Sequence, residues 1–222
     1  MITSWTILFD MDGVLFDSER ASLDCWQTLS GDYQLTNVEE VYRRCIGGDV
    51  RHTRSILVDA YPHLTGSVID EMLSRCSALF HEKYDHDGIP LPMKPGAREI
   101  LEDLSAQGIP LGLASSTRKA TVLQQLKNAD LLRYFQEVIG GDEVATSKPS
   151  PEIYETIRNR MGANPARCAA IEDSFNGVRA AHAAGCHTIM VPDMIPADDE
   201  MRGLAAVICE DLFAAQRYIH EL

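Results

Sequence analysis

Apolar and polar positions alternate with two different periods along this chain. Short apolar runs of strand length are followed by longer stretches in which apolar residues recur every three or four positions, as on a helix with one buried face. The expected strands comprise residues 6–9, 110–114, 138–140, 169–171 and 187–191. The expected helices between them comprise residues 97–107, 115–128, 150–161 and 175–184. Strands that alternate with helices predict an α/β fold with a doubly wound, mainly parallel sheet.

The region from Ser18 to Tyr84 differs from the rest because it shows helical spacing only. Its helices are expected at 23–29, 38–45 and 50–61, followed by one that carries an apolar stripe. The stripe consists of Ile69, Met72, Leu73, Cys76, Leu79 and Phe80. A proline-rich connector follows this region, because prolines disfavour helical geometry in the residues before them. We therefore expect an α/β core of residues 1–16 and 91–222, interrupted by an all-helical domain of residues 17–90.

Composition narrows the classes of function. With 222 residues, 45% of them hydrophobic, the chain can bury one such core and a small insert. Its net charge of −13 argues against a nucleic-acid partner, because phosphate backbones are bound through an excess of Lys and Arg. The six cysteines lack metal-ligand spacing and are expected to be reduced and buried. No apolar run reaches the roughly 20 residues that span a bilayer, so we expect a cytoplasmic protein with no membrane partner.

The segment Asp10-Met11-Asp12-Gly13 directly follows an apolar strand. Alternation along a strand places residues i and i+2 on the same side, so the two aspartates converge at its end. Carboxylates this close repel each other unless a cation lies between them, and Mg²⁺ prefers such oxygen ligands. The alternative is an ordinary turn after a strand, since Asp-Gly is common in turns.

Three further groups follow expected strands, at the sheet edge where open parallel sheets bind ligands. Ser115 and Ser116 offer hydroxyls and backbone N–H groups, or else cap a helix. Lys148 stands between rigid residues before a helix, or is an exposed turn lysine. Glu172 and Asp173 end an apolar strand, where adjacent acids would otherwise indicate a solvated loop.

Together, these groups suit phosphoryl transfer. One carboxylate can attack phosphorus, Mg²⁺ can offset the charge between carboxylates and phosphoryl oxygens, and the hydroxyl, N–H groups and lysine can stabilise the transition state. Without a metal, the clustered carboxylates would repel a phosphate dianion.

The four ordered groups make the chain resemble the haloacid dehalogenase superfamily, within its β-phosphoglucomutase-like group, which has a helical cap after the first strand. The resemblance covers essentially the whole chain. The first motif is matched by residues 10–15, the second by Ser115, the third by Lys148 and the fourth by residues 172–173.

This resemblance implies a role for each matched residue. Asp10 would be the nucleophile and a metal ligand. Asp12 would be the general acid and base, with its backbone carbonyl on Mg²⁺. Asp173 would be the third protein ligand, and Glu172 would assist directly or through water.

The remaining roles concern the substrate. The resemblance implies that Ser115 and Lys148 hold the transferring phosphoryl group. An aspartate at position 12 favours phosphate esters, since relatives that cleave carbon–halogen or phosphorus–carbon bonds lack an acid/base aspartate there.

We therefore predict a Mg²⁺-dependent phosphatase that acts as a monomer on a small phosphorylated metabolite, a sugar phosphate. For substrate binding we expect Ser116, Gly47 and Arg51 in the region that resembles the family's specificity loop, and Lys94 in the connector. The alternatives for Arg51 and Lys94 are solvated charges.

Two other functions stay open. A phosphomutase of the β-phosphoglucomutase type would use the same core, but Ser22 occupies the position of the histidine that the family mutases place in the first cap helix. A non-enzymatic binding module would also fit the fold, although every charged motif residue is present here.

Overall fold

The computed structural model describes residues 5–46, 50–86 and 89–222, and the chain forms two compact units. The core unit contains residues 1–17 and 91–222, and the helical unit contains residues 18–90. Asp17 belongs to the core unit and not to the insert, because its backbone N–H donates to the Pro92 carbonyl at 2.7 Å.

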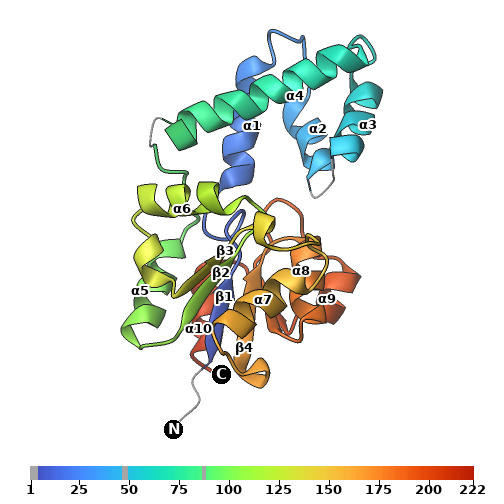
Figure 1. Ribbon diagram of the computed structural model, residues 1–222. Helices are drawn as coiled ribbons and strands as arrows, with labels where there is room; N and C mark the ends of the chain where they lie inside the picture. The colour runs from blue at the N-terminus through green and yellow to red at the C-terminus, as the bar shows by residue number, and fades with distance from the viewer. Residues whose placement is uncertain (1–4, 47–49, 87–88) are drawn as a thin grey trace. The chain divides into compact units, whose positions relative to one another are not determined.

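A six-stranded parallel sheet forms the centre of the core unit (Figure 1). The strands are β1 (Thr6–Phe9), β2 (Leu111–Ala114), β3 (Glu137–Ile139), β4 (Cys168–Glu172), β5 (His187–Met190) and β6 (Val207–Ile208). Their order across the sheet is β3-β2-β1-β4-β5-β6, so the chain winds outward in both directions from β1 and β4. The predicted doubly wound parallel fold is confirmed, and the short edge strand β6 is an addition to it.

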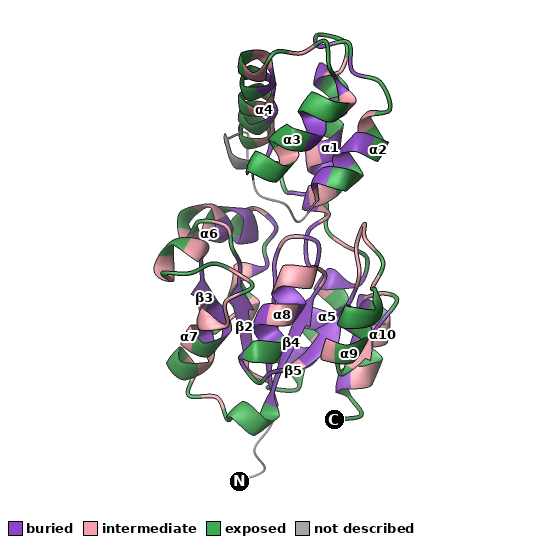
Figure 2. Ribbon diagram, turned by 90° about the vertical axis from the view of Figure 1, so that its right-hand side faces the viewer, coloured by how far each residue is buried: buried purple, intermediate pink, exposed green. Residues whose placement is uncertain are grey.

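Helices cover both faces of this sheet. They are α5 (Ala97–Ala106), α6 (Lys119–Asn128), α7 (Glu152–Arg160), α8 (Phe175–Ala183), α9 (Asp199–Leu204) and α10 (Leu212–Ile219), with single 3-10 turns η2 (Leu132–Tyr134), η3 (Gly141–Glu143) and η4 (Pro165–Arg167). α7 contacts β2 and β3, and α8 contacts β4 and β5, while α5 and α10 pack against each other. Figure 2 shows the resulting buried layer, in which four central strands, β1, β2, β4 and β5, are almost entirely buried.

The predicted start of α6 was wrong. We expected this helix to begin at Ser115, but it begins at Lys119. The Ser115 hydroxyl accepts from the Thr117 N–H at 3.0 Å, which closes a local turn, and therefore does not cap the helix.

The helical unit contains α1 (Ser18–Leu29), α2 (Val38–Cys45), α3 (Val50–Ala60), α4 (Gly66–His81) and the π-helical turn η1 (Glu82–His86). α1 packs against α2 and α4, and α3 packs against the same two helices. Of the predicted stripe on α4, Ile69, Met72 and Cys76 are buried. Among the residues described, we find no helix with the length and hydropathy needed to cross a membrane.

Candidate active site

Asp10 lies directly beyond the end of β1 and is nearly buried. Its backbone N–H donates to the Ile171 carbonyl of β4 at 3.0 Å, so β1 and β4 remain paired up to this residue. The fully buried strand residues before it leave Asp10 little freedom to move, and only 7% of it is exposed. The fold therefore fixes one carboxylate between the two central strands.

Lys148 connects this carboxylate to the end of β4. Its Nζ donates to Asp10 Oδ1 at 2.6 Å, to Glu172 Oε1 at 2.7 Å and to the Ala114 carbonyl at 3.2 Å. Burial alone would lower the pKa of Lys148, but the charges of Asp10 and Glu172 outweigh it and raise that pKa. The ammonium is therefore held charged at the carboxyl ends of β1, β2 and β4.

Glu172 is the last residue of β4 and is fully buried. Besides Lys148, its carboxylate accepts from the Tyr154 hydroxyl at 2.5 Å and from the Ser174 hydroxyl at 3.3 Å. A Cβ on Gly177 would lie 1.9 Å from Glu172 Oε2, so only glycine fits there. These contacts fix Glu172, and through it they orient Lys148.

Asp12 follows two residues after Asp10 and faces the loop after β2. Its Oδ2 accepts from the Thr117 hydroxyl at 3.0 Å and, more weakly, from the Ser115 hydroxyl at 3.5 Å. Ser115 is completely buried, and its N–H donates to the Ile139 carbonyl of β3 at 3.1 Å. The first and second motifs are thus joined by direct side-chain contacts.

The loop that carries these hydroxyls is backed by Gly140 and Gly141 after β3. A Cβ on Gly141 would lie 2.1 Å from the Ser116 carbonyl oxygen, and one on Gly140 would lie 2.2 Å from the Lys119 nitrogen. The Gly141 N–H also donates to the Thr117 carbonyl at 2.8 Å. This close backbone packing sets the position of the loop from Ser115 to Thr117.

Asp10, Glu172 and Asp173 form the one group of potential metal ligands found among the described residues, with one ligand atom of each within 4.8 Å of the others. Burial, opposed by Lys148 and supported by the charges of Glu172 and Asp12, raises the pKa of Asp10 to about 7. Burial and then the charges of Asp10, Glu172 and Asp193 raise the pKa of Asp173 well above its usual range.

These raised pKa values reflect burial first, and then the repulsion of neighbouring carboxylates that Lys148 only partly offsets. Asp173 also lies against the chain turn at Gly13, where a Cβ would come within 2.2 Å of Asp173 Oδ2. Carboxylate oxygens gathered in this way fit a hard divalent cation such as Mg²⁺.

The residues predicted to bind substrate lie in different settings. Ser116 is exposed on the loop after β2, and Arg51 is exposed on α3 of the helical unit. Lys94 forms an ion pair with Asp193 at 2.5 Å, so it is engaged within the core unit. Gly47 lies outside the described residues.

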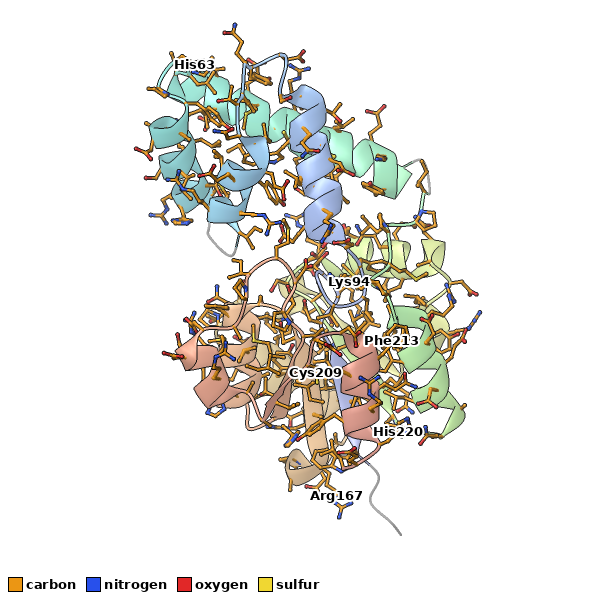
Figure 3. All side chains as sticks on the ribbon, turned by 180° about the vertical axis from the view of Figure 1, so that it is seen from behind. His63, Lys94, Arg167, Cys209, Phe213 and His220 are labelled. Atoms are coloured by element: carbon orange, nitrogen blue, oxygen red, sulfur yellow. The ribbon has the colours of Figure 1, made fainter. Side chains whose placement is uncertain are left out.

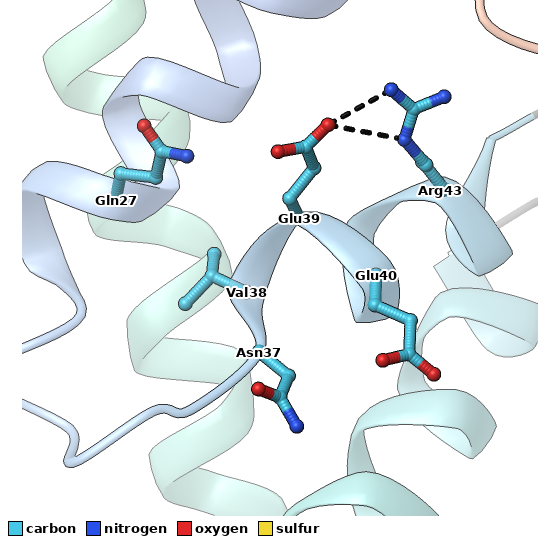
Figure 4. Close-up of a pocket in the computed structure, with 6 residues that line it drawn as sticks. All are labelled: Gln27, Asn37, Val38, Glu39, Glu40 and Arg43. Carbon is cyan, nitrogen blue, oxygen red and sulfur yellow. Dashed lines mark hydrogen bonds and ion pairs between the residues drawn. The ribbon is translucent and has the colours of Figure 1, made fainter.

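A pocket of the helical unit offers no comparable chemistry. It is lined by Gln27, Asn37, Val38, Glu39, Glu40 and Arg43 (Figure 4). Its arginine and Glu39 pair with each other at 2.8 Å, and both are about half exposed.

Three residues of the site were not predicted from the sequence. Thr117 lies in the segment that we singled out, but we assigned it no role. Tyr154 is the third residue of α7 and is fully buried, so its position in the sequence is typical of an ordinary core residue. Asp193 lies in a loop after β5 and carries no local signal of its own.

Comparisons with known proteins all indicate the same family of hydrolases. The sequence profile of the haloacid dehalogenase-like hydrolases matches residues 7–191. A phosphorylated carbohydrates phosphatase of Thermotoga maritima is 33% identical over 183 residues, which are 82% of each chain. Hexitol phosphatase B of Escherichia coli K12 is 28% identical, over 92% of this chain and 95% of that protein.

The fold is shared as well. The crystal structure of a haloacid dehalogenase family hydrolase from Deinococcus radiodurans R1, with bound phosphate and sodium, superposes with a TM-score of 0.83. The superposition covers 100% of this chain and 97% of that one at 23% identity. With the motif residues in place and the profile spanning most of its length, the chain belongs to the haloacid dehalogenase-like hydrolase family.

Proposed function

We propose that this protein is a Mg²⁺-dependent phosphatase that hydrolyses a monoester of a small phosphorylated metabolite, a sugar phosphate, with Asp10 as the nucleophile. The observation that carries the proposal is the buried contact of Lys148 with Asp10 and Glu172, formed beside Asp12 and its two hydroxyl donors. The names of the curated relatives, which include phosphatases of phosphorylated carbohydrates and hexitols, support the same class of reaction.

In the first step, a carboxylate oxygen of Asp10 attacks phosphorus and forms an acyl phosphate, while the ester P–O bond breaks. The leaving oxygen takes the proton of the Asp12 carboxyl group. Thr117 holds Asp12 in place for this transfer through the hydrogen bond to Oδ2.

In the second step, Asp12 is a carboxylate and removes a proton from water as the water oxygen attacks phosphorus. The bond between phosphorus and Asp10 breaks, which releases inorganic phosphate and restores the Asp10 carboxylate. Lys148 and the loop from Ser115 to Thr117 stabilise the phosphoryl oxygens in both steps.

Asp10 and Asp173 would hold the metal directly. Glu172 would act mainly by fixing Lys148, because both of its oxygens already accept hydrogen bonds. When bound, Mg²⁺ supplies positive charge that offsets the repulsion between the carboxylates and a phosphoryl dianion.

Phosphate release from a panel of phosphorylated metabolites tests the proposal. With Mg²⁺ present, we expect release of inorganic phosphate from one or more sugar phosphates, and no release after chelation of the metal. An isomerised sugar phosphate that forms only with a bisphosphate primer would instead identify a mutase. Equal turnover by the Asp10→Asn variant would remove Asp10 from the mechanism.

A further inference from the structure

An ion pair of the core unit lies next to the carboxylate cluster but is separate from it. Lys94 Nζ donates to Asp193 Oδ1 at 2.5 Å, and the side chains are only 18% and 4% exposed. A pair this shielded from water interacts much more strongly than the half-exposed pairs on the surface of this protein.

The pairing of β5 with β4 brings the loop of Asp193 to the edge of the carboxylate cluster. Asp193 follows β5, which pairs with β4 up to the contact of Glu172 with Met190. The next residue, Val191, donates its N–H to the Glu172 carbonyl at 2.7 Å, so the loop that carries Asp193 begins beside Asp173.

One oxygen of Asp193 has no hydrogen-bond partner among the described residues. Oδ2 is buried and unpartnered, whereas Oδ1 accepts from Lys94. A buried carboxylate with one unsatisfied oxygen depends strongly on its single cationic partner.

The backbone at Lys94 is held by the segment that follows Asp12. Its N–H donates to the Leu15 carbonyl at 2.9 Å, and the preceding Met93 forms an antiparallel bridge with Phe16. This places the ammonium on the segment that pairs with the turn after Asp12. The ion pair therefore joins the connector, which pairs with the loop after β1, to the loop after β5.

We propose that Asp193 and Lys94 are positioning residues that set, with opposite signs, the affinity of the Asp10–Asp173 cluster for its divalent cation. This inference rests on the proposed function. Asp193 adds a negative charge near the cation, and Lys94 offsets it. Removal of the lysine charge therefore strengthens cation binding, and removal of the aspartate charge weakens it. If the pair only held the loops together, removal of either charge would weaken cation binding.

The test is direct measurement of Mg²⁺ binding by calorimetry, and of Mn²⁺ binding by electron paramagnetic resonance, on the full chain without substrate. We expect Lys94→Gln to lower the Kd and Asp193→Asn to raise it, each by about tenfold, the lower end of the effect of residues behind metal ligands. The double variant returns to near the wild-type Kd, and Lys94→Arg keeps it.

Matched controls carry the same charge changes away from the site. Figure 3 shows Lys94 and Arg167 at opposite ends of the core unit, so Arg167→Gln is the control for the lysine. Asp130→Asn is the control for the acid, because Asp130 is exposed and has a positive φ of 54°, which asparagine tolerates. Both controls should leave the Kd unchanged.

Equal weakening by Lys94→Gln and Asp193→Asn, or no change in either, overturns the inference while the metal site stands. Binding that is absent in the wild type, or unaffected by Asp173→Asn, overturns the metal site and the inference with it. If Lys94→Gln does not fold, as judged by circular dichroism, the double variant still decides: a Kd near the wild-type value supports the inference, and a Kd raised as in Asp193→Asn contradicts it.

Discussion

Buried ion pairs of the core unit differ from the exposed ion pairs described in the helical unit. In the core unit, Lys148 contacts Asp10 and Glu172 with all three side chains at most 9% exposed. In the helical unit, pairs such as Arg75 with Asp32 and Arg44 with Asp59 have side chains that are 45–75% exposed. Exposed ion pairs contribute little to the free energy of unfolding, whereas a buried charge that has lost its partner lowers it strongly.

This difference indicates where the chemistry lies. A protein tolerates buried charges when they are mutually paired or when they bind an ion. The core unit has four carboxylates and one lysine at the carboxyl ends of its central strands, an arrangement that is costly unless a cation binds there. The helical unit contains no comparable cluster among its described residues.

Replacement of the nucleophile should have the largest effect. We expect Asp10→Asn to lower kcat by roughly 10⁴-fold or more, as the loss of a nucleophile does in other covalent mechanisms. The matched change in the helical unit, Asp32→Asn, removes an exposed carboxylate of the same type and should leave kcat unchanged. Steady-state phosphate release measures both variants, and similar losses in the two would contradict the contrast between the units.

Removal of the buried lysine should affect stability as well as activity. In the metal-free protein, Lys148→Met leaves Asp10 and Glu172 without their cationic partner and should lower the free energy of unfolding by about 3–5 kcal/mol. Arg75→Met, its counterpart in the helical unit, should change that free energy little. Urea denaturation with chelator present compares the two, and a stable Lys148→Met protein would show that the core pair is not special.

Loss of the hydroxyl that holds Asp12 should have a smaller effect. Thr117→Val keeps the shape of the side chain but removes its hydrogen bond to Asp12, and we expect kcat to fall about tenfold with little change in KM. Thr28→Val removes a hydroxyl of the helical unit that donates to a backbone carbonyl, and serves as the control. An unchanged kcat in Thr117→Val would mean that Asp12 is positioned by other groups.

The pH dependence of metal binding should give the smallest signal. The pKa of Asp10 is raised from 3.8 to about 7, so the folded metal-free protein binds a proton more tightly than the unfolded chain. Its stability from this group is therefore full below the unfolded pKa and is lost as the pH rises through about 7.

Mg²⁺ competes with that proton, so it should stabilise the protein more at high pH. We expect saturating Mg²⁺ to raise Tm by about 5 °C near pH 8 and by much less near pH 5.5. Thermal denaturation at both pH values measures this difference. An equal increase at the two values would show that Mg²⁺ does not bind through Asp10.

Much of this architecture could be predicted from local sequence, for physical reasons. The runs before Asp10 and Glu172 are apolar because both faces of their strands are covered, and the α4 stripe is apolar on one face because only that face is buried. Strand ends meet at one edge of a parallel sheet, so acidic residues at those ends could be expected to converge.

The remaining features depend on contacts between distant segments. Ser115 was expected to cap or begin a helix, but packing of the backbone at Gly140 and Gly141 holds its loop in a turn. Tyr154 reaches Glu172 only because α7 packs across β2 and β3. The partner of Lys94 is 99 residues away in the chain, so local pattern could not reveal that pair.

The central claim is that Asp10 receives the phosphoryl group. Rapid acid quench during turnover, followed by borohydride reduction and peptide mapping by mass spectrometry, identifies the residue that carried an acyl phosphate, because reduction converts that aspartate into homoserine. We predict homoserine at position 10 in the protein quenched with substrate and Mg²⁺, and none when substrate is omitted. Modification at a different carboxylate, or active turnover with no acyl phosphate at position 10, would contradict the mechanism.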